Sequence, residues 1–424
     1  MDFLEELKWR GLIHDQTPGI KETLSEGMKL GYIGFDPTAP SMTIGNYVQI
    51  MLLKFFQLSG HKPIVLKGGV TGRIGDPSGK DKERTLKSYD ELDSNLTHQQ
   101  HQLMKFLDFE QGDNKAVLVN NLDFYKNMNV LDFLRDVGKN LTINYMMSKD
   151  SVKNRIDRGL SFTEFSYQLL QGYDFAKMNK DMGVTIEMGG SDQYGNITAG
   201  IEMSRKLNGA KVFAVTTPLL TKADGSKFGK SEGGNIWLDP EMTSPYKFYQ
   251  FWLNANDPDL PTFFRYFSLR KKEEILELEA THKDDPQTLK RVLAEELTTR
   301  IHSKEAYESV LRVTQILFNR KASKDQLLSL ESDDLKLVSQ EIPSYEVAAS
   351  DLKNGLSITN LLVEKTSILS SNGEVRKAIK NNAISVNKDK ITSHETIVNS
   401  DQFLHNQFIM VENGKKNKFM IVVK

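Results

Sequence analysis

The sequence contains no cysteine, and this absence removes two kinds of site at once. Disulfide bonds and zinc sites with thiolate ligands are both excluded. The eight histidines show no spacing typical of metal ligands, so we expect no protein-bound metal. Any site chemistry must therefore come from Asp, Glu, Lys, Arg, Tyr and Gln side chains.

Long apolar runs are also missing, since none reaches the roughly 18 residues that predict a membrane helix. The first residues, Met-Asp-Phe-Leu-Glu-Glu-Leu, carry early acidic side chains in an ordinary amphipathic pattern. This pattern argues against a signal or transit peptide. We therefore expect a cytoplasmic protein with no membrane partner.

An excess of one charge is absent from the chain as a whole, whose formal net charge is −1. The charges are nevertheless unevenly distributed. Residues 355–424 carry ten lysines and arginines against six acidic residues, a net charge of +4, which leaves −5 on the rest. A basic C-terminal piece on an acidic body indicates contact with nucleic acid.

Apolar β-type segments alternate with helical ones between residues 29 and 240. Their hydrophobic content is continuous, as is typical of strands buried on both faces. This alternation predicts an α/β fold with a doubly wound parallel sheet, in which ligands bind beyond the carboxyl ends of the strands. The predicted strands are residues 29–35, 63–67, 116–121, 184–188 and 211–216.

The rest of the chain predicts further domains, as a length of 424 residues also does. A helical pattern runs from about residue 244 to 318. An acidic run with one proline, from residue 325 to 351, is typical of a linker with some local helix. Beyond it we predict a small domain with a helix from Ser371 through Lys380 and strands at 383–387 and 408–411.

The segment from Tyr32 to Asn46 predicts a strand end, a crossing loop and the start of a helix at residues 47–58. Gly34 leaves room for a flat ligand against the backbone. Gly45 does the same at the helix start, and Asn46 can cap it. Free N–H groups and the helix dipole there favour a phosphate group. The competing interpretation is an ordinary strand-to-helix loop.

A second glycine-rich loop runs from Gly68 to Arg84. Its glycines allow the backbone to approach a ligand closely. Asp76 is placed to hold an ammonium group or ribose hydroxyls, and Lys80, Lys82 and Arg84 could close over phosphates. The loop is not a Walker A motif, because the Gly-Lys-Ser/Thr ending is absent. A solvated turn is the alternative.

A third loop, Gly189-Gly-Ser-Asp-Gln-Tyr-Gly-Asn196, places Gly190 and a polar quartet at a strand end. Asp192 suits ribose hydroxyls, as the acid after a strand does in dinucleotide folds. Upstream, Tyr167, Gln171 and Asp174 share one face of a predicted helix. Such a stripe alone is more often a packed helix face than a binding site.

The segment Thr221 to Ser231 contains Lys227-Phe-Gly-Lys230-Ser231. Two lysines three residues apart, separated by an aromatic residue and a glycine, predict a mobile cationic loop. Mobility and positive charge suit transient stabilisation of a pentacovalent phosphate. A plain exposed loop is a weak alternative here, because this segment follows several other ligand-like loops.

Lys227-Phe-Gly-Lys230-Ser231 resembles the KMSKS signature of class I aminoacyl-tRNA synthetases, in the form found in bacterial tyrosyl-tRNA synthetases. The loops at Tyr32 and Gly68, the helix face and the Gly-Gly-Ser-Asp-Gln loop match the same family in order and spacing. The resemblance covers essentially the whole chain. It implies a Rossmann-like catalytic domain at 1–240, a helical anticodon-binding domain at 241–322, a linker at 323–354 and a small α+β RNA-binding domain at 355–424.

The resemblance also implies roles for single residues. The phenol of the substrate would bind Tyr32 and Asp174, and its α-ammonium group Asp76, Tyr167 and Gln171. The tyrosyl-adenylate and the ATP would bind Gly34, Asp36, Gly45, Gly190, Asp192, Gln193 and Lys230. Groups that act on the phosphates would be Thr38, Thr43, Asn46, Lys80, Arg84, Lys227, Lys230 and Ser231. Transfer RNA would contact Arg376, Lys377 and Lys380.

Three departures from the family stand out. Its H-I-G-H motif is Thr43-Ile-Gly-Asn46 here, with a hydroxyl and an amide in place of two imidazoles. Glu187 stands where the family often has Gln beside the tyrosine pocket. Asn372-Gly373 replaces a basic pair that often opens the C-terminal helix, so we expect weaker tRNA contact there.

The reaction implied is activation of L-tyrosine by ATP, with Mg²⁺, followed by transfer of the tyrosyl group to tyrosine tRNA. The resemblance also implies a homodimer, with residues 117–136 among the candidates for its interface. Two alternatives stay open: a tryptophanyl relative, disfavoured by Tyr32 with Asp174, and a non-catalytic RNA-binding paralogue, suggested by Thr43 and Asn46.

Overall fold

The computed structural model describes residues 1–79, 84–156, 159–231, 234–319, 322–353, 355–414 and 417–424. Lys80 therefore lies outside the described residues. The backbone of Lys230 and Ser231 is described and their side chains are not. The chain forms two compact units, residues 1–243 with 251–297 and residues 244–250 with 298–424.

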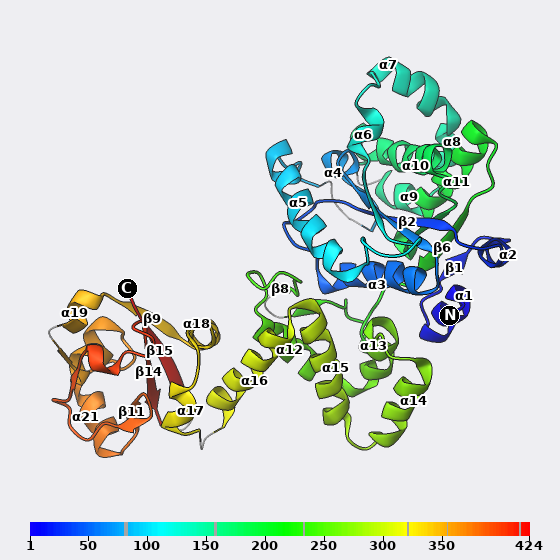
Figure 1. The fold of residues 1–424 in the computed structure, drawn as a ribbon. Coiled ribbons are helices and arrows are strands. Elements are labelled where there is room, and N and C mark those ends of the chain that lie inside the picture. The colour runs from blue at the N-terminus through cyan, green and yellow to red at the C-terminus, as the bar shows by residue number, and fades with distance from the viewer. Residues whose placement is uncertain (80–83, 157–158, 232–233, 320–321, 354, 415–416) are drawn as a thin grey trace. The chain divides into compact units, whose positions relative to one another are not determined.

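A six-stranded sheet forms the centre of the first unit (Figure 1). Its order is β1-β6-β5-β2-β3-β4, and all neighbouring strands are parallel except β1 and β6. All five predicted strands are present, with ends shifted by one or two residues, and β1 was not predicted. The strands are β1 (Asp15–Gln16), β2 (Leu30–Phe35), β3 (Lys62–Lys67), β4 (Val117–Asn120), β5 (Ile186–Gly190) and β6 (Phe213–Thr217).

Helices cover both faces of this sheet (Figure 1). The helices of the unit are α1 (Phe3–Arg10), α2 (Ile20–Ser25), α3 (Ile44–Leu58), α4 (Thr71–Ile74), α5 (Tyr89–Phe106), α6 (Leu122–Tyr125), α7 (Val130–Asp132), η1 (Phe133–Val137), η2 (Gly138–Asn140), α8 (Ile143–Met147), α9 (Asp150–Ile156), α10 (Phe162–Met182), η3 (Ser191–Gln193), α11 (Tyr194–Asn208), η4 (Asp257–Asp259), α13 (Leu260–Phe267) and α14 (Lys272–Thr281). Two more, α12 (Pro245–Leu253) and α15 (Pro286–Ile301), have residues in both units.

Strand β2 shows how sequence alternation divides the two faces. Successive side chains of a strand point to opposite sides of the sheet. A Cβ at Gly31 would lie 2.8 Å from the ring of Phe56 in α3, so the glycine admits that helix closely. The next residue, Tyr32, packs edge-on against Phe175 of α10, with ring centroids 5.3 Å apart. The doubly wound arrangement predicted from the sequence is confirmed.

Helix α3 begins earlier than predicted, at Ile44 rather than at residue 47. Its N-cap is Thr43, whose hydroxyl accepts a bond from the backbone N–H of Asn46, while the Asn46 side chain accepts from the backbone N–H of Thr43. This reciprocal pair is a capping box. The prediction of Asn46 as the cap is therefore corrected: Thr43 is the cap, and Gly45 and Asn46 lie in the first helical turn.

The second unit contains a five-stranded sheet in the order β12-β11-β14-β15-β9 and a two-stranded sheet, β10 with β13. The predicted helix at Ser371 is present, with Ser371 accepting a bond from the backbone N–H of Glu374. The strands are β9 (Ser344–Val347), β10 (Leu356–Ser357), β11 (Ile384–Val386), β12 (Asp389–Lys390), β13 (Ile397–Val398), β14 (Phe408–Asn413) and β15 (Asn417–Val423). The helices are α16 (Lys304–Phe318), α17 (Lys324–Leu328), α18 (Ser332–Glu341), α19 (Ala349–Lys353), α20 (Ile358–Asn360), η5 (Leu361–Lys365), α21 (Asn372–Lys380) and η6 (Ser400–Gln402).

Part of the segment predicted as a linker is built into this sheet. Strand β9 runs parallel to β15, with Ser344 opposite Met420 and Val347 opposite Val423. Leu335 and Val338 of α18 are fully buried. The acidic composition predicted a linker because most of the charged side chains are exposed, while Asp334 is buried in an ion pair with Arg312 and apolar residues of the segment are buried as well.

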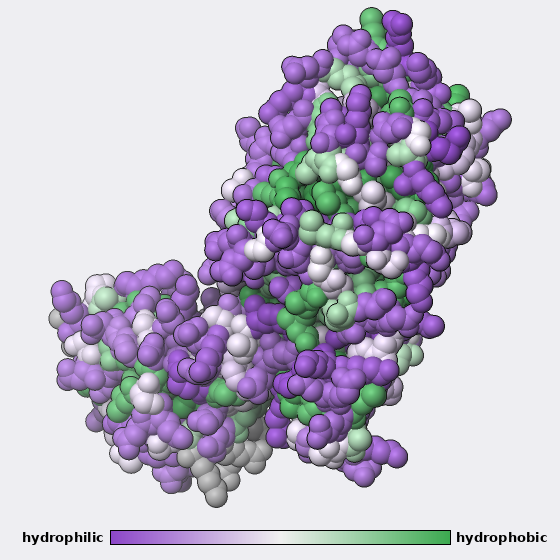
Figure 2. Space-filling model, turned by 45° about the vertical axis from the view of Figure 1, so that its right-hand side comes forward, coloured by the Kyte–Doolittle hydropathy of each residue, from purple (hydrophilic) through white to green (hydrophobic). Residues whose placement is uncertain are grey.

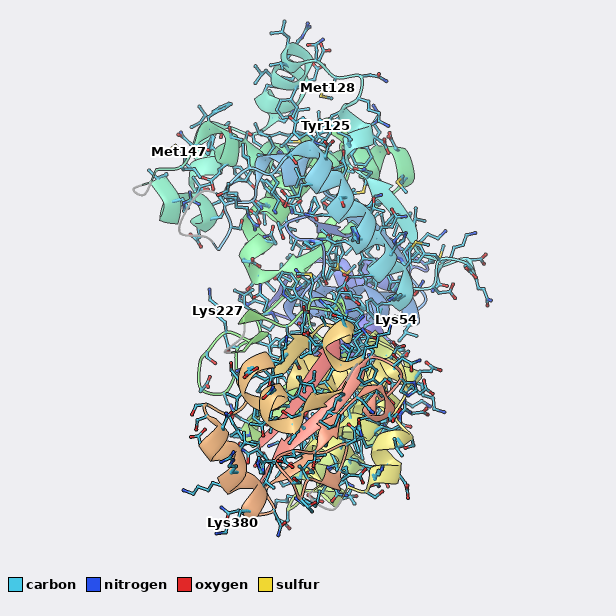
Figure 3. All side chains as sticks on the ribbon, turned by 90° about the vertical axis from the view of Figure 1, so that its left-hand side faces the viewer. Lys54, Tyr125, Met128, Met147, Lys227 and Lys380 are labelled. Carbon is cyan, nitrogen blue, oxygen red and sulfur yellow. The ribbon has the colours of Figure 1, made fainter. Side chains whose placement is uncertain are left out.

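The surface of the molecule is mainly hydrophilic on the face shown in Figure 2, with hydrophobic residues scattered among polar ones. In the described part of the chain no helix is both long and apolar enough to cross a membrane. Arg376, Lys377 and Lys380 are exposed on α21, and Figure 3 shows Lys380 at the end of that helix.

Candidate active site

A cavity of about 780 Å³ opens at the carboxyl ends of β2 and β5. Parallel sheets bind ligands at this edge, as the sequence predicted. The cavity brings together most of the predicted site residues, from loops far apart in the sequence. Those that line it are Tyr32, Gly34, Asp36, Thr38, Thr43, Gly45, Asn46, Asp76, Arg84, Tyr167, Gln171, Asp174, Gly190, Asp192, Gln193 and Lys227.

Asp174 of α10 is held at the inner end of the cavity by two hydrogen bonds. The Asn121 amide donates to it at 2.9 Å, and the Tyr125 hydroxyl donates at 3.0 Å. Burial raises the pKa of Asp174 to about 8, although these two donors favour the ionised form. Figure 3 shows Tyr125 within this unit. The acid is thus fixed in place, buried, and part of the cavity lining.

Tyr32 lies beside Asp174 at the same end. Its hydroxyl is buried and has no hydrogen-bond partner among the described residues. An unpaired buried hydroxyl costs free energy unless a ligand pairs with it. Tyr32 and Asp174 together can therefore recognise a hydroxyl group of a ligand, such as that of a phenol.

Asp36 is the centre of a second network. Thr71 donates to its Oδ1 at 2.6 Å and Tyr167 donates to its Oδ2 at 2.9 Å. Burial raises the pKa of Asp36 to about 6, against the effect of both donors. A Cβ at Gly68 would lie 2.1 Å from Asp36 Oδ1, so only glycine fits there. The predicted ligand groups Asp36 and Tyr167 are thus bound to each other.

Asp76 links the second and third loops of the site. Gln193 donates its side-chain N–H to Asp76 Oδ2 at 2.7 Å, and the backbone N–H of Ser78 donates to Oδ1 at 2.9 Å. The Asn196 amide donates to the Ser78 hydroxyl at 3.3 Å. The structure therefore fixes Asp76 and Gln193 as one unit at the wall of the cavity.

The Thr43 and Asn46 side chains are bonded to each other. Asn46 Oδ1 accepts from the Thr43 backbone N–H at 3.0 Å and from the Thr43 hydroxyl at 2.8 Å. The amide N–H₂ of Asn46 is then the group left to donate towards a ligand. From the sequence we expected both residues to donate to phosphate. In the structure the hydroxyl proton of Thr43 is already donated to Asn46.

The loop with Lys227 is attached to this helix start through the backbone. Ile44 N–H donates to Ile236 O at 2.9 Å, and Ile236 N–H donates to Gly229 O at 3.0 Å. Gly229 has φ +80°, and a Cβ there would lie 3.0 Å from Ile44. Both the backbone conformation and this close contact therefore favour glycine. The two signature motifs are therefore held against each other.

Phe228 anchors the same loop. It is buried among four aromatic rings, with centroid distances of 5.1–6.0 Å. These rings belong to Phe251, Trp252, Phe263 and Phe267. Lys227, directly before it, is exposed on the loop and lines the cavity (Figure 3). A fixed aromatic residue thus presents the ammonium group of Lys227 to the cavity.

Several residues of the site were given no individual role from the sequence: Thr71, Ser78 and Asn196, which lie in the predicted loops, and Tyr125. Asn121 was noted only as a polar residue at a strand end. Each of them has a partner 35 to 120 residues away, so no local pattern identified them. In the described residues no group of three or more His, Asp or Glu side chains is arranged to hold a metal ion.

Comparison with known proteins agrees with this geometry. Residues 28–319 match the model of class I tRNA synthetases (W and Y), and residues 334–421 match the tyrosine–tRNA ligase SYY-like C-terminal domain. A solved structure of a C-terminally truncated mitochondrial tyrosyl-tRNA synthetase from Aspergillus nidulans is 31% identical, with a TM-score of 0.68, and covers 75% of this chain and 94% of its own.

Two curated relatives match along their whole length. The tyrosine–tRNA ligase of Cytophaga hutchinsonii is 51% identical over 99% of both chains. That of Porphyromonas gingivalis is 47% identical over 100% of both chains. The relatives thus include the C-terminal sheet as well as the cavity. The chain belongs to the tyrosine–tRNA ligase family of class I aminoacyl-tRNA synthetases.

Proposed function

We propose that this protein activates L-tyrosine with ATP and transfers the tyrosyl group to the 3′ end of tyrosine tRNA. One observation carries the proposal. The cavity has a buried polar end, with the unpaired hydroxyl of Tyr32 beside Asp174, and an exposed end with a helix N-terminus and Lys227. A phenol fits the first end and the phosphates of ATP fit the second.

The first step needs no nucleophile or strong base from the protein. A carboxylate oxygen of tyrosine forms a bond to the α-phosphorus of ATP, and the bond from that phosphorus to the bridging oxygen breaks. Pyrophosphate leaves with the electron pair. Catalysis here consists of positioning and of stabilising charge on the transferred phosphate.

Separate groups would perform these two tasks. Asp76, Tyr167 and Gln171 would hold the ammonium group, so that the carboxylate faces the phosphates. Gly34 would admit the ligand against the backbone, since a Cβ there would meet nothing closer than Leu66 at 4.0 Å. The adenosine would lie along Gly190, Asp192 and Gln193. Phosphate contacts would come from Thr38, Asn46, Lys80, Arg84, Lys227, Lys230 and Ser231, with Mg²⁺ arriving bound to ATP.

In the second step a ribose hydroxyl at the 3′ end of the tRNA attacks the tyrosyl carbonyl carbon. The bond from that carbon to the phosphate oxygen breaks, and AMP leaves. We assign the domains as the resemblance implied, except that β9 belongs with the C-terminal sheet. Arg376, Lys377 and Lys380 would contact the tRNA from the exposed face of α21.

Changing these three residues together to glutamine tests the tRNA contact. We expect tyrosine-dependent pyrophosphate exchange to stay unchanged, since none of them lines the cavity. Charging of tRNA should fall about tenfold or more, with a weaker dependence on salt. Lys365→Gln, in the same domain but paired with Asp351 at 2.8 Å, is the control. Full charging by the triple variant would remove α21 from the interface.

A homodimer in the cytoplasm is the assembly we propose. Large apolar side chains are exposed in the segment from α7 to the start of α10, where a monomer would leave them in water. Val130 is 72% exposed, Leu131 77%, Ile143 65% and Phe162 75%. Part of this segment lies within the predicted interface at residues 117–136. Sedimentation of the wild type and of a Leu131→Glu variant would test the proposal.

Exchange of pyrophosphate into ATP, measured with each amino acid in turn, tests the central proposal. Exchange that depends on tyrosine alone supports it. Exchange that depends on tryptophan would favour the tryptophanyl relative. No exchange with any amino acid, together with intact tRNA binding, would favour the non-catalytic RNA-binding paralogue.

A further inference from the structure

Glu187 is the one buried acid at the tyrosine end that the proposed reaction does not use. It lies on β5, is only 2% exposed, and lines the cavity. Its Oε1 accepts a bond from the Gln171 amide N–H at 2.8 Å, and its Oε2 has no partner among the described residues. Neither oxygen pairs with a cation of the described residues, and burial of a carboxylate without such a partner costs free energy.

The sheet register places Glu187 beside Tyr32. The two residues are direct neighbours on the parallel strands β5 and β2, so their side chains point to the same face. Both side chains have a buried oxygen without a hydrogen-bond partner in the described structure. The fold also leaves space for the acid, because a Cβ at Gly200 of α11 would lie 3.0 Å from Glu187 Oε2.

The chemistry of a carboxylate fixes what its neighbours can do. An ionised carboxylate only accepts hydrogen bonds, whereas the amide of a glutamine at this position could also donate. Glu187 therefore draws the amide N–H of Gln171 and the hydroxyl proton of Tyr32 towards itself. The carbonyl oxygen of Gln171 and the lone pairs of the Tyr32 oxygen are then left for a ligand.

We propose that Glu187 is a positioning residue that makes Gln171 and Tyr32 hydrogen-bond acceptors and so selects a ligand that donates from both ends, through an ammonium group and a phenolic hydroxyl. The inference rests on the proposed function, since L-tyrosine is such a ligand. Glu187 touches no reacting atom, and it acts through its two neighbours and through its negative charge.

Titration of this acid should be visible in ligand binding. Burial raises the pKa of Glu187 to about 7, against the opposing effect of Gln171 and Tyr32. Among the described residues, the titratable groups that face it are Tyr32 of β2 and Asp174 of α10, and the α11 residue beside its Oε2 is Gly200, which has no side chain. The negative charge of Glu187 should be present above about pH 7 and lost as the pH falls below it. The acceptor roles that this charge imposes on Gln171 and Tyr32 should be lost with it. Because Asp174 titrates nearby, a comparison with Glu187→Gln is needed to isolate this acid.

The experiment is equilibrium binding of L-tyrosine without ATP, between pH 6 and pH 8.5, to the wild type and to Glu187→Gln. At pH 8 we expect the variant to bind tyrosine about five- to tenfold more weakly, the difference between a charged and a neutral acceptor. At pH 6 the wild type and Glu187→Gln should bind tyrosine equally well. At pH 8 the variant should also discriminate less strongly between L-tyrosine and L-phenylalanine. Glu202→Gln, the same change at an acid paired with Arg205 and Lys206 on α11, is the matched control.

Equal tyrosine affinity and equal pH dependence in the wild type and Glu187→Gln would overturn the proposal. If that variant does not fold, Glu187→Met, which also removes the titrating carboxyl group, replaces it in the same comparison, and tyrosine affinity and pH dependence equal to those of the wild type would again overturn the proposal. A wild type without tyrosine-dependent pyrophosphate exchange would instead contradict the proposed function. An active wild type with an unaltered Glu187→Gln variant would contradict this inference alone.

Discussion

The two ends of the cavity are built in different ways. At the tyrosine end, hydrogen bonds join residues far apart in the chain, such as Tyr167 with Asp36, 131 residues away, and Asn121 with Asp174, 53 away. At the phosphate end, Thr43 and Asn46 are bonded three residues apart. The first end is fixed by the tertiary fold before any ligand binds. The second is a local motif with exposed donors, suited to contacts formed during the reaction.

Lys230→Ala should show the largest effect at the phosphate end. The expected result is a barrier to adenylate formation higher by about 2–4 kcal/mol, the scale for one lost transition-state donor, with tyrosine affinity unchanged. Pre-steady-state adenylate formation and equilibrium tyrosine binding would measure the two quantities. Lys222→Ala, on the same loop but away from the cavity lining, is the control. A loss of tyrosine affinity as large as the loss in rate would instead place Lys230 at the tyrosine end of the cavity.

Glu187→Gln should stabilise the fold at the tyrosine end. Because burial raises its pKa from 4.5 to about 7, the folded state holds the proton more tightly than the unfolded state. The free energy of unfolding therefore falls as the pH rises from about 4.5 to 7. Above about pH 7 the destabilisation by the ionised Glu187 is complete. Relative to the wild type, the free energy of unfolding of the variant should be higher by up to about 3 kcal/mol at pH 8 and by little at pH 5. Urea titrations at both pH values would measure this, and an equal gain at both would contradict it.

Tyr32→Phe should weaken tyrosine binding by about 1–2 kcal/mol, because the ligand hydroxyl loses one partner in a buried site. The preference for tyrosine over phenylalanine should narrow by the same amount. Pyrophosphate exchange with tyrosine and with phenylalanine would measure this preference. Tyr266→Phe removes a hydroxyl bonded to Gly11 O at 3.0 Å, outside the cavity, and should leave both values unchanged. An unchanged preference in Tyr32→Phe would move phenol recognition to Asp174 alone.

Thr43→His should have the smallest effect on catalysis. Since the Thr43 hydroxyl is already bonded to Asn46, its loss should change the rate of adenylate formation by less than about 1.5 kcal/mol. Loss of the helix cap should instead lower the free energy of unfolding by about 1 kcal/mol. Thr43→Ser keeps the cap and should match the wild type in both. A rate that falls strongly in Thr43→His and stays unchanged in Thr43→Ser would return the Thr43 hydroxyl to the phosphate site.

This contrast also explains how much the sequence could predict. The phosphate end was predictable because its motifs are contiguous, as in Thr43-Ile-Gly-Asn46. The main strands were predictable because burial on both faces makes each a continuous apolar run. The identities of Tyr32, Asp36 and Asp174 as site residues followed from the resemblance.

The hydrogen bonds of the tyrosine end were not predictable. That Tyr125 and Asn121 hold Asp174, or that Thr71 holds Asp36, depends on which strands lie side by side. No local spacing encodes that. Strand β9 was missed for a related reason, because only Val347 of its four residues is buried and the strand is defined by its pairing with β15.

Strand β9 has a practical consequence for work on isolated pieces of this protein. It occupies the outer side of β15, which would otherwise be the last strand of its sheet. A fragment that begins at residue 355 would leave a row of backbone donors and acceptors on β15 open to pairing with other copies, which promotes aggregation. A fragment that begins before α18 would keep that edge covered. Failure of the shorter fragment to bind RNA would therefore report self-association rather than a lack of affinity.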